Sequence, residues 1–118
     1  MSDGERPSPQ ERLRNFVSKY LPKIRDYYQP TEVWLWGSHA YGEPHEYSDI
    51  DIIVVSDRFT GDWALAERAI ELAKRVGLDF RREIGTVEVI CYRPEEFERQ
   101  RNRITIVAEG IKKGKRLL

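Results

Sequence analysis

The sequence predicts a small α/β domain of the α+β kind, in which a mixed β-sheet is flanked by helices. The chain has 118 residues, of which 40% are hydrophobic, and this suits one compact core. Apolar residues recur at helical spacing in some segments and form short β-branched or aromatic runs in others. In chain order these segments read α-β-β-α-β-α-α, an order that fits a small sheet covered by helices.

The first expected element is a helix over residues 10–28, where apolar side chains recur every three or four positions. Pro22 lies inside this segment and is expected to kink the helix or split it in two. Residues 1–9 contain two prolines, a glycine and no apolar residue after the first, so they are expected to be a flexible lead-in. The folded domain is therefore expected to cover residues 10–118.

Two strands are expected next. Residues 31–36 are β-branched and aromatic, which predicts a strand running into Gly37 and Ser38. A short helix can begin at residues 39–41. Residues 49–55 predict a second strand, apolar enough at its far end to be buried on both faces.

The second half of the chain predicts, in order, a helix, a strand and two further helices. An amphipathic helix over residues 61–76 is closed by Gly77. A third strand is expected at residues 86–92, a short helix beginning at Pro94 and a last helix around residues 104–112.

The charges of the chain cancel, since 20 Lys and Arg residues face 20 Asp and Glu residues. This balance argues against a uniformly basic nucleic-acid binder, so nucleic acid is a possible partner but not the favoured one. The C-terminal end is locally basic; a solvated face is the expectation, and contact with RNA or an acidic partner is the alternative. Its basic residues are Arg99, Arg101, Arg103, Lys112, Lys113, Lys115 and Arg116.

The only cysteine, Cys91, lies in an apolar run and is expected to be a buried, inert thiol in a reducing compartment. The N-terminus lacks the apolar stretch of a signal peptide, and no run of apolar residues is long enough to span a membrane. A cytoplasmic protein without membrane partners is therefore expected.

The segment from residue 34 to residue 55 carries the chemistry. A Gly37-Ser38 turn after a strand exposes backbone N–H groups and a hydroxyl, which suits a phosphate, although most such pairs are ordinary turns. Asp49 and Asp51 are two residues apart on a strand, so both carboxylates project from one face and repel each other unless a cation lies between them. Such oxygen ligands suit Mg²⁺. The alternative is that one aspartate caps a turn and the other faces solvent.

Glu88 is the only carboxylate inside the third expected strand, between two valines. If that strand lies beside residues 49–55, Glu88 completes a cluster of three carboxylates. The alternative is an exposed side chain on a half-solvated strand.

Gly37-Ser38, ten intervening residues and then Asp49-Ile50-Asp51 resemble the signature of the DNA polymerase beta-like nucleotidyltransferase superfamily. Over residues 10–118 the chain is similar to the smallest members, the minimal nucleotidyltransferases that pair with HEPN-domain partners as antitoxins. The resemblance implies the polymerase beta-like nucleotidyltransferase fold.

The resemblance also implies a function for each matched residue. Gly37 and Ser38 would hold a nucleoside triphosphate, expected to be ATP, while Asp49, Asp51 and Glu88 would bind divalent metal and carry catalysis. Two Mg²⁺ ions are expected with substrate bound, and AMP would be transferred from Mg·ATP to an acceptor hydroxyl on a HEPN-domain partner. The open alternatives are a non-catalytic antitoxin that only masks its partner, and transfer to a small molecule or an RNA end.

One position departs from the family pattern, because Tyr41 stands where an arginine is common after Gly-Ser. The change removes a bidentate phosphate partner and bears on how tightly the triphosphate is held.

Tyr41 and Tyr47 are candidates for stacking on a nucleobase, whereas Trp34 and Trp36 are expected to pack in the core. His39 and His45 are expected at the surface or against substrate rather than on a metal, because no second ligand lies at a spacing known from metal sites.

Overall fold

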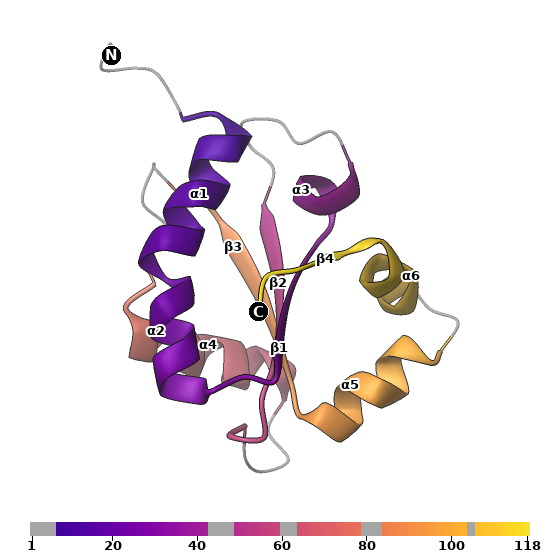
Figure 1. The fold of residues 1–118 in the computed structure, drawn as a ribbon. Helices are drawn as coiled ribbons and strands as arrows, with labels where there is room; N and C mark the ends of the chain where they lie inside the picture. Colours follow the sequence, from indigo (N-terminus) through magenta and orange to yellow (C-terminus); the bar gives the residue numbers. More distant parts are fainter. Residues whose placement is uncertain (1–6, 43–48, 60–63, 79–83, 104–105) are drawn as a thin grey trace.

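The computed structural model describes residues 7–42, 49–59, 64–78, 84–103 and 106–118 (Figure 1). A four-stranded mixed sheet has the order β3-β2-β1-β4. β1 (Glu32–Trp36) pairs antiparallel with both β2 (Ile50–Val55) and β4 (Lys115–Arg116), and β2 pairs parallel with β3 (Val87–Tyr92). Helices flank this sheet, so the predicted fold class is confirmed.

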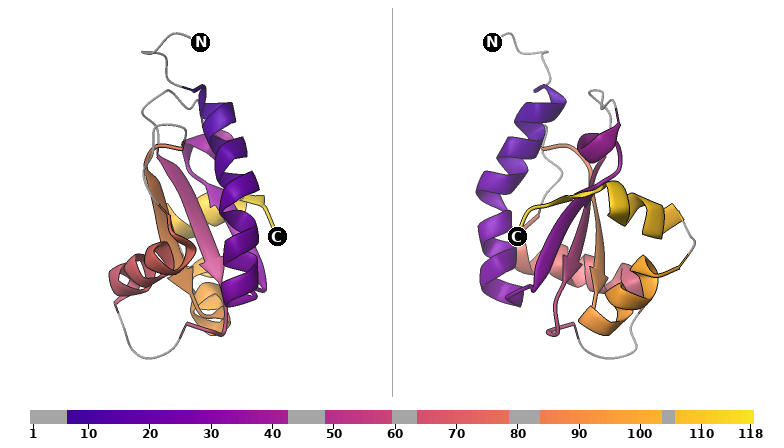
Figure 2. Two further views of the ribbon diagram at one scale, coloured as in Figure 1. Left: turned by 90° about the vertical axis from the view of Figure 1, so that its left-hand side faces the viewer. Right: turned by 45° about the vertical axis from the view of Figure 1, so that its right-hand side comes forward.

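The larger hydrophobic core joins one face of the sheet to α1 (Pro9–Lys19), α2 (Leu21–Tyr28) and α4 (Leu65–Val76). Figure 2 shows α1 and α2 along one side of the sheet, with the C-terminal helices on the other. Full burial of aromatic and branched side chains stabilises this layer. Its fully buried members include Phe16, Tyr20, Ile24, Ile52 and Leu72.

The opposite face of the sheet packs against α5 (Pro94–Arg101) and α6 (Ile106–Lys113). Phe97 is fully buried there, with its ring centroid 6.5 Å from that of Trp34. Trp34 and Trp36 both pack against this second cluster, which confirms their prediction as core residues. Because β2 contributes to both clusters, its predicted burial on two faces is also confirmed.

The expected N-terminal helix is divided as Pro22 predicted, and the break falls at Tyr20, two residues before the proline. Pro22 then occupies the first turn of α2, where a missing N–H costs nothing. α1 begins at Pro9 with Ser8 as its cap: the Ser8 hydroxyl accepts a hydrogen bond of 3.1 Å from the Glu11 N–H.

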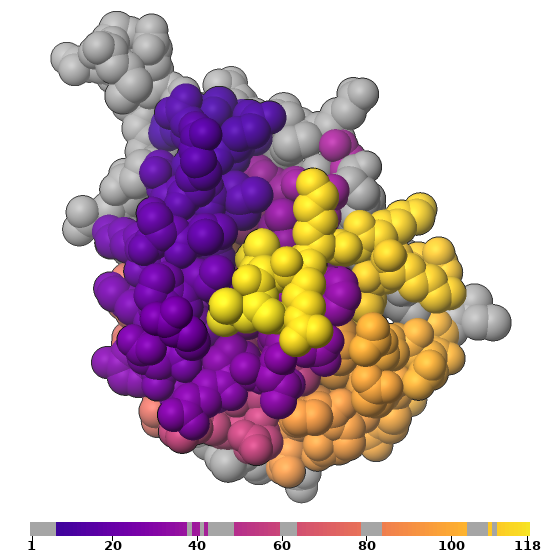
Figure 3. All heavy atoms as spheres, viewed as in Figure 1, coloured from indigo at the N-terminus to yellow at the C-terminus, as the bar shows by residue number. Residues whose placement is uncertain are grey.

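The strand β4 was not predicted. Only two residues, Lys115 and Arg116, form it, and both are charged and exposed. The backbone holds this segment in place, since the Leu117 N–H donates to the Val33 carbonyl over 2.7 Å. Figure 3 shows the C-terminal residues in yellow lying across the surface between the indigo α1 and the orange α5.

The helix α4 is the amphipathic helix that the sequence predicts, but only part of its apolar set is buried. Its buried positions are Arg68, Leu72 and Val76, one every four residues. Leu65 and Ile70, two apolar residues of the same helix, are 40% and 56% exposed. α4 therefore carries apolar side chains on two faces, and only one of them is covered by the described residues. The first expected helical residues, 61–63, lie outside the described part of the chain.

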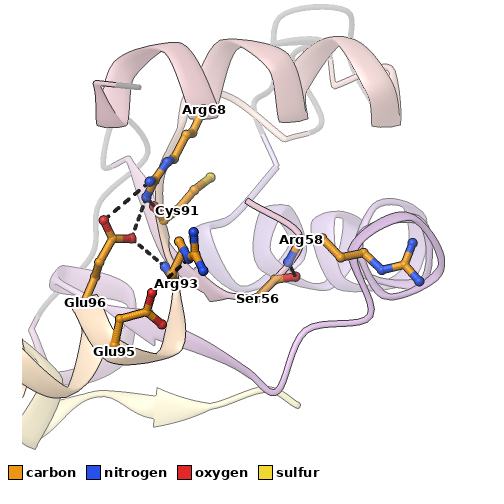
Figure 4. Close-up of polar contacts among 7 residues, drawn as sticks. All are labelled: Ser56, Arg58, Arg68, Cys91, Arg93, Glu95 and Glu96. Carbon is orange, nitrogen blue, oxygen red and sulfur yellow. Dashed lines mark hydrogen bonds and ion pairs between the residues drawn. The ribbon is translucent and has the colours of Figure 1, made fainter. Parts of the chain in front are cut away.

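An arginine buried at 4% exposure joins α4 to β3 and α5 (Figure 4). Arg68 Nη1 donates to Glu96 Oε1 over 2.6 Å and to the Cys91 carbonyl over 3.1 Å. The same Glu96 oxygen accepts from the Arg93 N–H at 2.7 Å, which closes the start of α5. Partial burial raises the pKa of Glu96, but hydrogen bonds from Arg68 and the Arg93 N–H, with the charges of both arginines, outweigh it and hold the pKa below its usual value.

We expect Glu96→Ala to lower the free energy of unfolding by about 3 kcal/mol, because it leaves the buried Arg68 guanidinium without its carboxylate. The loss should shrink as the pH falls through the ordinary range of a glutamate and below it. Folding lowers the pKa of Glu96, so its stabilisation is present above that range and disappears in acid. Urea unfolding at neutral and acidic pH measures both effects.

The control is Glu95→Ala, which removes the neighbouring carboxylate. Glu95 is 2.9 Å from Arg93 Nε in an exposed ion pair, so its loss should change the unfolding free energy by less than about 1 kcal/mol. Equal losses in the two variants would show that the buried pair contributes nothing beyond a surface contact.

Candidate active site

Gly37 makes the turn between β1 and α3 (Ser38–Tyr41) with a φ of +77°, a left-handed conformation that side-chain-bearing residues rarely adopt. The Ala40 N–H donates to the Gly37 carbonyl over 3.0 Å and closes the turn. A Cβ built on Gly37 would collide with the Asp51 carboxylate, whose Cγ would lie only 3.1 Å away. The turn and the carboxylate are therefore in direct contact, and only glycine leaves room for both.

Asp51 and Glu88 are direct partners in the parallel pairing of β2 with β3. Side chains in register on neighbouring strands point to the same face, and these two carboxyl groups share a hydrogen bond. Burial first, then the charge and hydrogen bond of Glu88 and the charge of Asp49, raise the pKa of Asp51 to about 6. Two of the three carboxylates singled out in the sequence, Asp51 and Glu88, therefore lie side by side.

Asp49 lies one residue before β2 and is half-buried, while Glu88 is exposed. Among the described residues, no three His, Cys, Asp or Glu side chains are spaced to hold one metal ion together. The donor set is nevertheless all oxygen, with the neighbouring carboxyl groups of Asp51 and Glu88 on one face of the sheet. That chemistry fits Mg²⁺, which takes one or two protein carboxylates and completes its shell with water and substrate phosphates.

Comparison with known proteins places this site in a family. The model of the nucleotidyltransferase domain matches residues 17–113. The chain belongs to the nucleotidyltransferase domain family. No curated protein matches the chain.

One solved structure shares the fold, and two others are similar at lower scores. A crystal structure described as a nucleotidyltransferase from Sulfolobus solfataricus is 20% identical, with a TM-score of 0.56, over 83% of this chain and 85% of that one. A toxin-antitoxin crystallised with AMP-PNP is 22% identical, with a TM-score of 0.45, over 93% of this chain and 73% of that one. A variant of the toxin-antitoxin MntA-HpeT is 20% identical, with a TM-score of 0.44, over 90% and 69%.

Several candidate site residues of this nucleotidyltransferase domain lie wholly or partly outside the described part of the structure. Ser38 and Tyr41 lie in α3, next to Gly37, but their side chains are outside the described part of the structure. His45 and Tyr47 also lie outside the described residues. The phosphate-binding function of Ser38 and the stacking function of the two tyrosines stay predictions.

The pairing of β1 with β2 places Trp36, which the sequence predicts only as a core residue, next to Asp51. Trp36 is the antiparallel partner of Asp51, so its half-buried indole lies beside the carboxylate on the same face. The spacing of Trp34 and Trp36 predicted that they share one face of β1. The pairing of β1 with β2 shows that Asp51 lies on that same face. Trp36 therefore lies between the candidate active site and the second hydrophobic core, beside Asp51 and against the second cluster.

Cys91 has no part in this chemistry. It is fully buried, and burial raises the pKa of its thiol to about 12 against the opposing charge of Arg68. The predicted burial of this thiol is therefore confirmed, and a raised pKa is what an unreactive thiol needs. Among the described helices, none is both long enough and apolar enough to cross a membrane.

Proposed function

We propose that this nucleotidyltransferase domain transfers AMP from Mg·ATP to an acceptor hydroxyl and releases pyrophosphate. The observation that carries the proposal is the pair of carboxyl groups of Asp51 and Glu88, in register on β2 and β3, with Asp51 against the Gly37 turn. Two like charges side by side cost stability unless a cation or a proton lies between them, which is typical of a functional site.

In this proposal Asp51, Glu88 and Asp49 hold Mg²⁺, with two ions when substrate is bound. When bound, Mg²⁺ would supply Lewis-acid chemistry, lowering the pKa of the attacking hydroxyl and neutralising charge on the departing phosphates. The acceptor oxygen forms a bond to the α-phosphorus, and the bond from that phosphorus to the bridging oxygen breaks as pyrophosphate leaves. The exposed Glu88 accepts the hydroxyl proton, while Gly37 and Ser38 hold the triphosphate.

The direct test incubates the purified chain with ATP labelled at the α-phosphate, Mg²⁺ and a candidate acceptor. We expect labelled acceptor and pyrophosphate in equal amounts, with both lost on addition of EDTA. Competition by unlabelled GTP, CTP and UTP reports the base preference. Label transfer that persists unchanged in EDTA would contradict the metal-dependent reaction.

The acceptor is proposed to be a hydroxyl on a HEPN-domain toxin, with this chain as the antitoxin. This proposal rests on the resemblance to minimal nucleotidyltransferases and on the exposure of Glu88. Glu88 lies on β3, the outermost strand of the described sheet, so a group on a separate macromolecule can reach it.

A co-expression experiment distinguishes transfer from masking. If the Asp49→Asn/Asp51→Asn variant no longer neutralises the toxin, and the wild type adds an AMP-sized mass to it, transfer is the mechanism. If the double variant still neutralises the toxin and no mass is added, the chain is a binding module. Turnover without any protein partner would instead indicate a small molecule or an RNA end as acceptor.

A further inference from the structure

The outer flank of α4 forms an apolar groove with the edge strand β3, on the face of β3 opposite to Glu88. Figure 2 shows α4 beside the sheet. The α4 groove has a volume of about 370 Å³, with Ala69 and Ala73 on the helix side and Val87 and Val89 on the strand side. Ile70 rises beside it with 56% of its surface exposed. An exposed isoleucine next to an open apolar groove marks a contact surface.

A second hollow lies on the other side of Ile70. Its volume is about 310 Å³, and it is lined by Glu67, Glu71 and Lys74 as well as by the isoleucine. Ile70 is thus a protruding side chain with a depression on each side. The alanines at the helix surface leave space for another helix to come close.

We propose that the α4 groove is the interface of a homodimer, in which α4 of one copy packs antiparallel against α4 of a second copy. Glu67 and Lys74 are both exposed and lie seven residues apart, two helical turns, on one face of α4. A two-fold axis midway between them places Glu67 of each copy opposite Lys74 of the other. The same axis brings Ile70 of each copy to the apolar depression of its partner.

The charge pattern is what favours a second copy over a different protein. Glu67 lies three residues before Ile70 and Lys74 four residues after it, so the two opposite charges face each other across a two-fold axis that passes close to Ile70. A partner of other sequence would not need this arrangement. The candidate active site stays accessible in the dimer. Val87 and Val89 line the groove from one face of β3, whereas Glu88 projects from the opposite face.

Sedimentation velocity over a range of concentrations tests the proposal. We expect the wild type to dimerise and Ile70→Glu to weaken dimerisation at least about tenfold, as for a side chain at the centre of an interface. The matched control is Tyr27→Glu on α2, which changes a side chain of similar exposure, 49%, outside the groove. Nucleotidyl transfer per chain and the circular dichroism spectrum should be the same in both variants.

A charge exchange identifies the occupant. Glu67→Lys and Lys74→Glu should each weaken dimerisation, and the double variant Glu67→Lys/Lys74→Glu should restore it, because both cross-copy pairs then have opposite charges again. A monomer at every concentration would overturn the proposal. So would a dimer that withstands Ile70→Glu, or a double variant weaker than either single variant.

Discussion

Replacing Asp51 with asparagine is expected to lower the rate of nucleotidyl transfer at least about a hundredfold and, without metal, to make the protein more stable. Loss of a group that only supports a metal ligand costs about 10- to 100-fold, so loss of a proposed ligand should exceed that range. The gain in stability has a separate cause. An asparagine amide can donate to the Glu88 carboxylate, and the repulsion between the two carboxylates disappears.

The pH dependence of the metal-free protein should reveal this repulsion. Folding raises the pKa of Asp51 from its ordinary 3.8 to about 6, so between these values the folded chain holds a proton that the unfolded chain has released. Wild-type stability should therefore fall as the pH rises through this window, by the linkage between proton binding and folding. Asp51→Asn cannot ionise at this position and should lack that fall.

Thermal unfolding in EDTA across the pH range measures the stability, and the transfer assay measures the rate. Asp57→Asn is the matched control, because Asp57 is exposed and follows the other end of β2. It should change neither property. If Asp51→Asn were less stable than the wild type at neutral pH in EDTA, the carboxyl pair would be a stabilising contact and not a site held open for a cation.

The part of this site that the sequence predicted depends on local pattern. The two aspartates at the start of an apolar run, and a glutamate between valines, predicted a carboxylate cluster on the condition that their strands are neighbours. The pairing of β2 with β3 places Asp51 and Glu88 in direct register. Period-two alternation fixes which residues share a face, and burial of β2 on both faces leaves little freedom to slip the register.

The remaining features depend on contacts between residues distant in the sequence. Arg68 reads as a polar position on an amphipathic helix, yet it is buried because Glu96, 28 residues later, and the Cys91 carbonyl accept its hydrogen bonds. Ile70 reads as a core residue, yet it is exposed because Arg68 occupies the buried stripe. The two-residue strand β4 has no pattern to detect, since backbone hydrogen bonds to β1 define it.

Replacing Gly37 with alanine should be the most damaging single-methyl change in the described part of the chain. The left-handed φ of +77° costs a residue with a Cβ about 1 to 2 kcal/mol, and the new methyl would also displace the Asp51 carboxylate. A shift of a catalytic group by about 1 Å can cost a hundredfold in rate. We therefore expect Gly37→Ala to lose both stability and nucleotidyl transfer.

Gly77→Ala separates backbone strain from the collision with Asp51. Gly77 closes α4 with a φ of +67°, nearly that of Gly37, and an added Cβ there meets nothing within 4 Å. This variant should lose about 1 to 2 kcal/mol in chemical denaturation from the left-handed backbone alone and keep full activity. Any additional loss in Gly37→Ala then measures the contact with Asp51.

A double-mutant cycle completes the test. In an Asp51→Ala background the carboxyl group is gone, so Gly37→Ala should cost no more stability than Gly77→Ala does in the wild type. The difference between the two backgrounds is the coupling free energy between the turn and the carboxylate. A coupling of zero would mean that the Asp51 carboxylate can move aside at no cost, and that Gly37 is required only by the geometry of the turn.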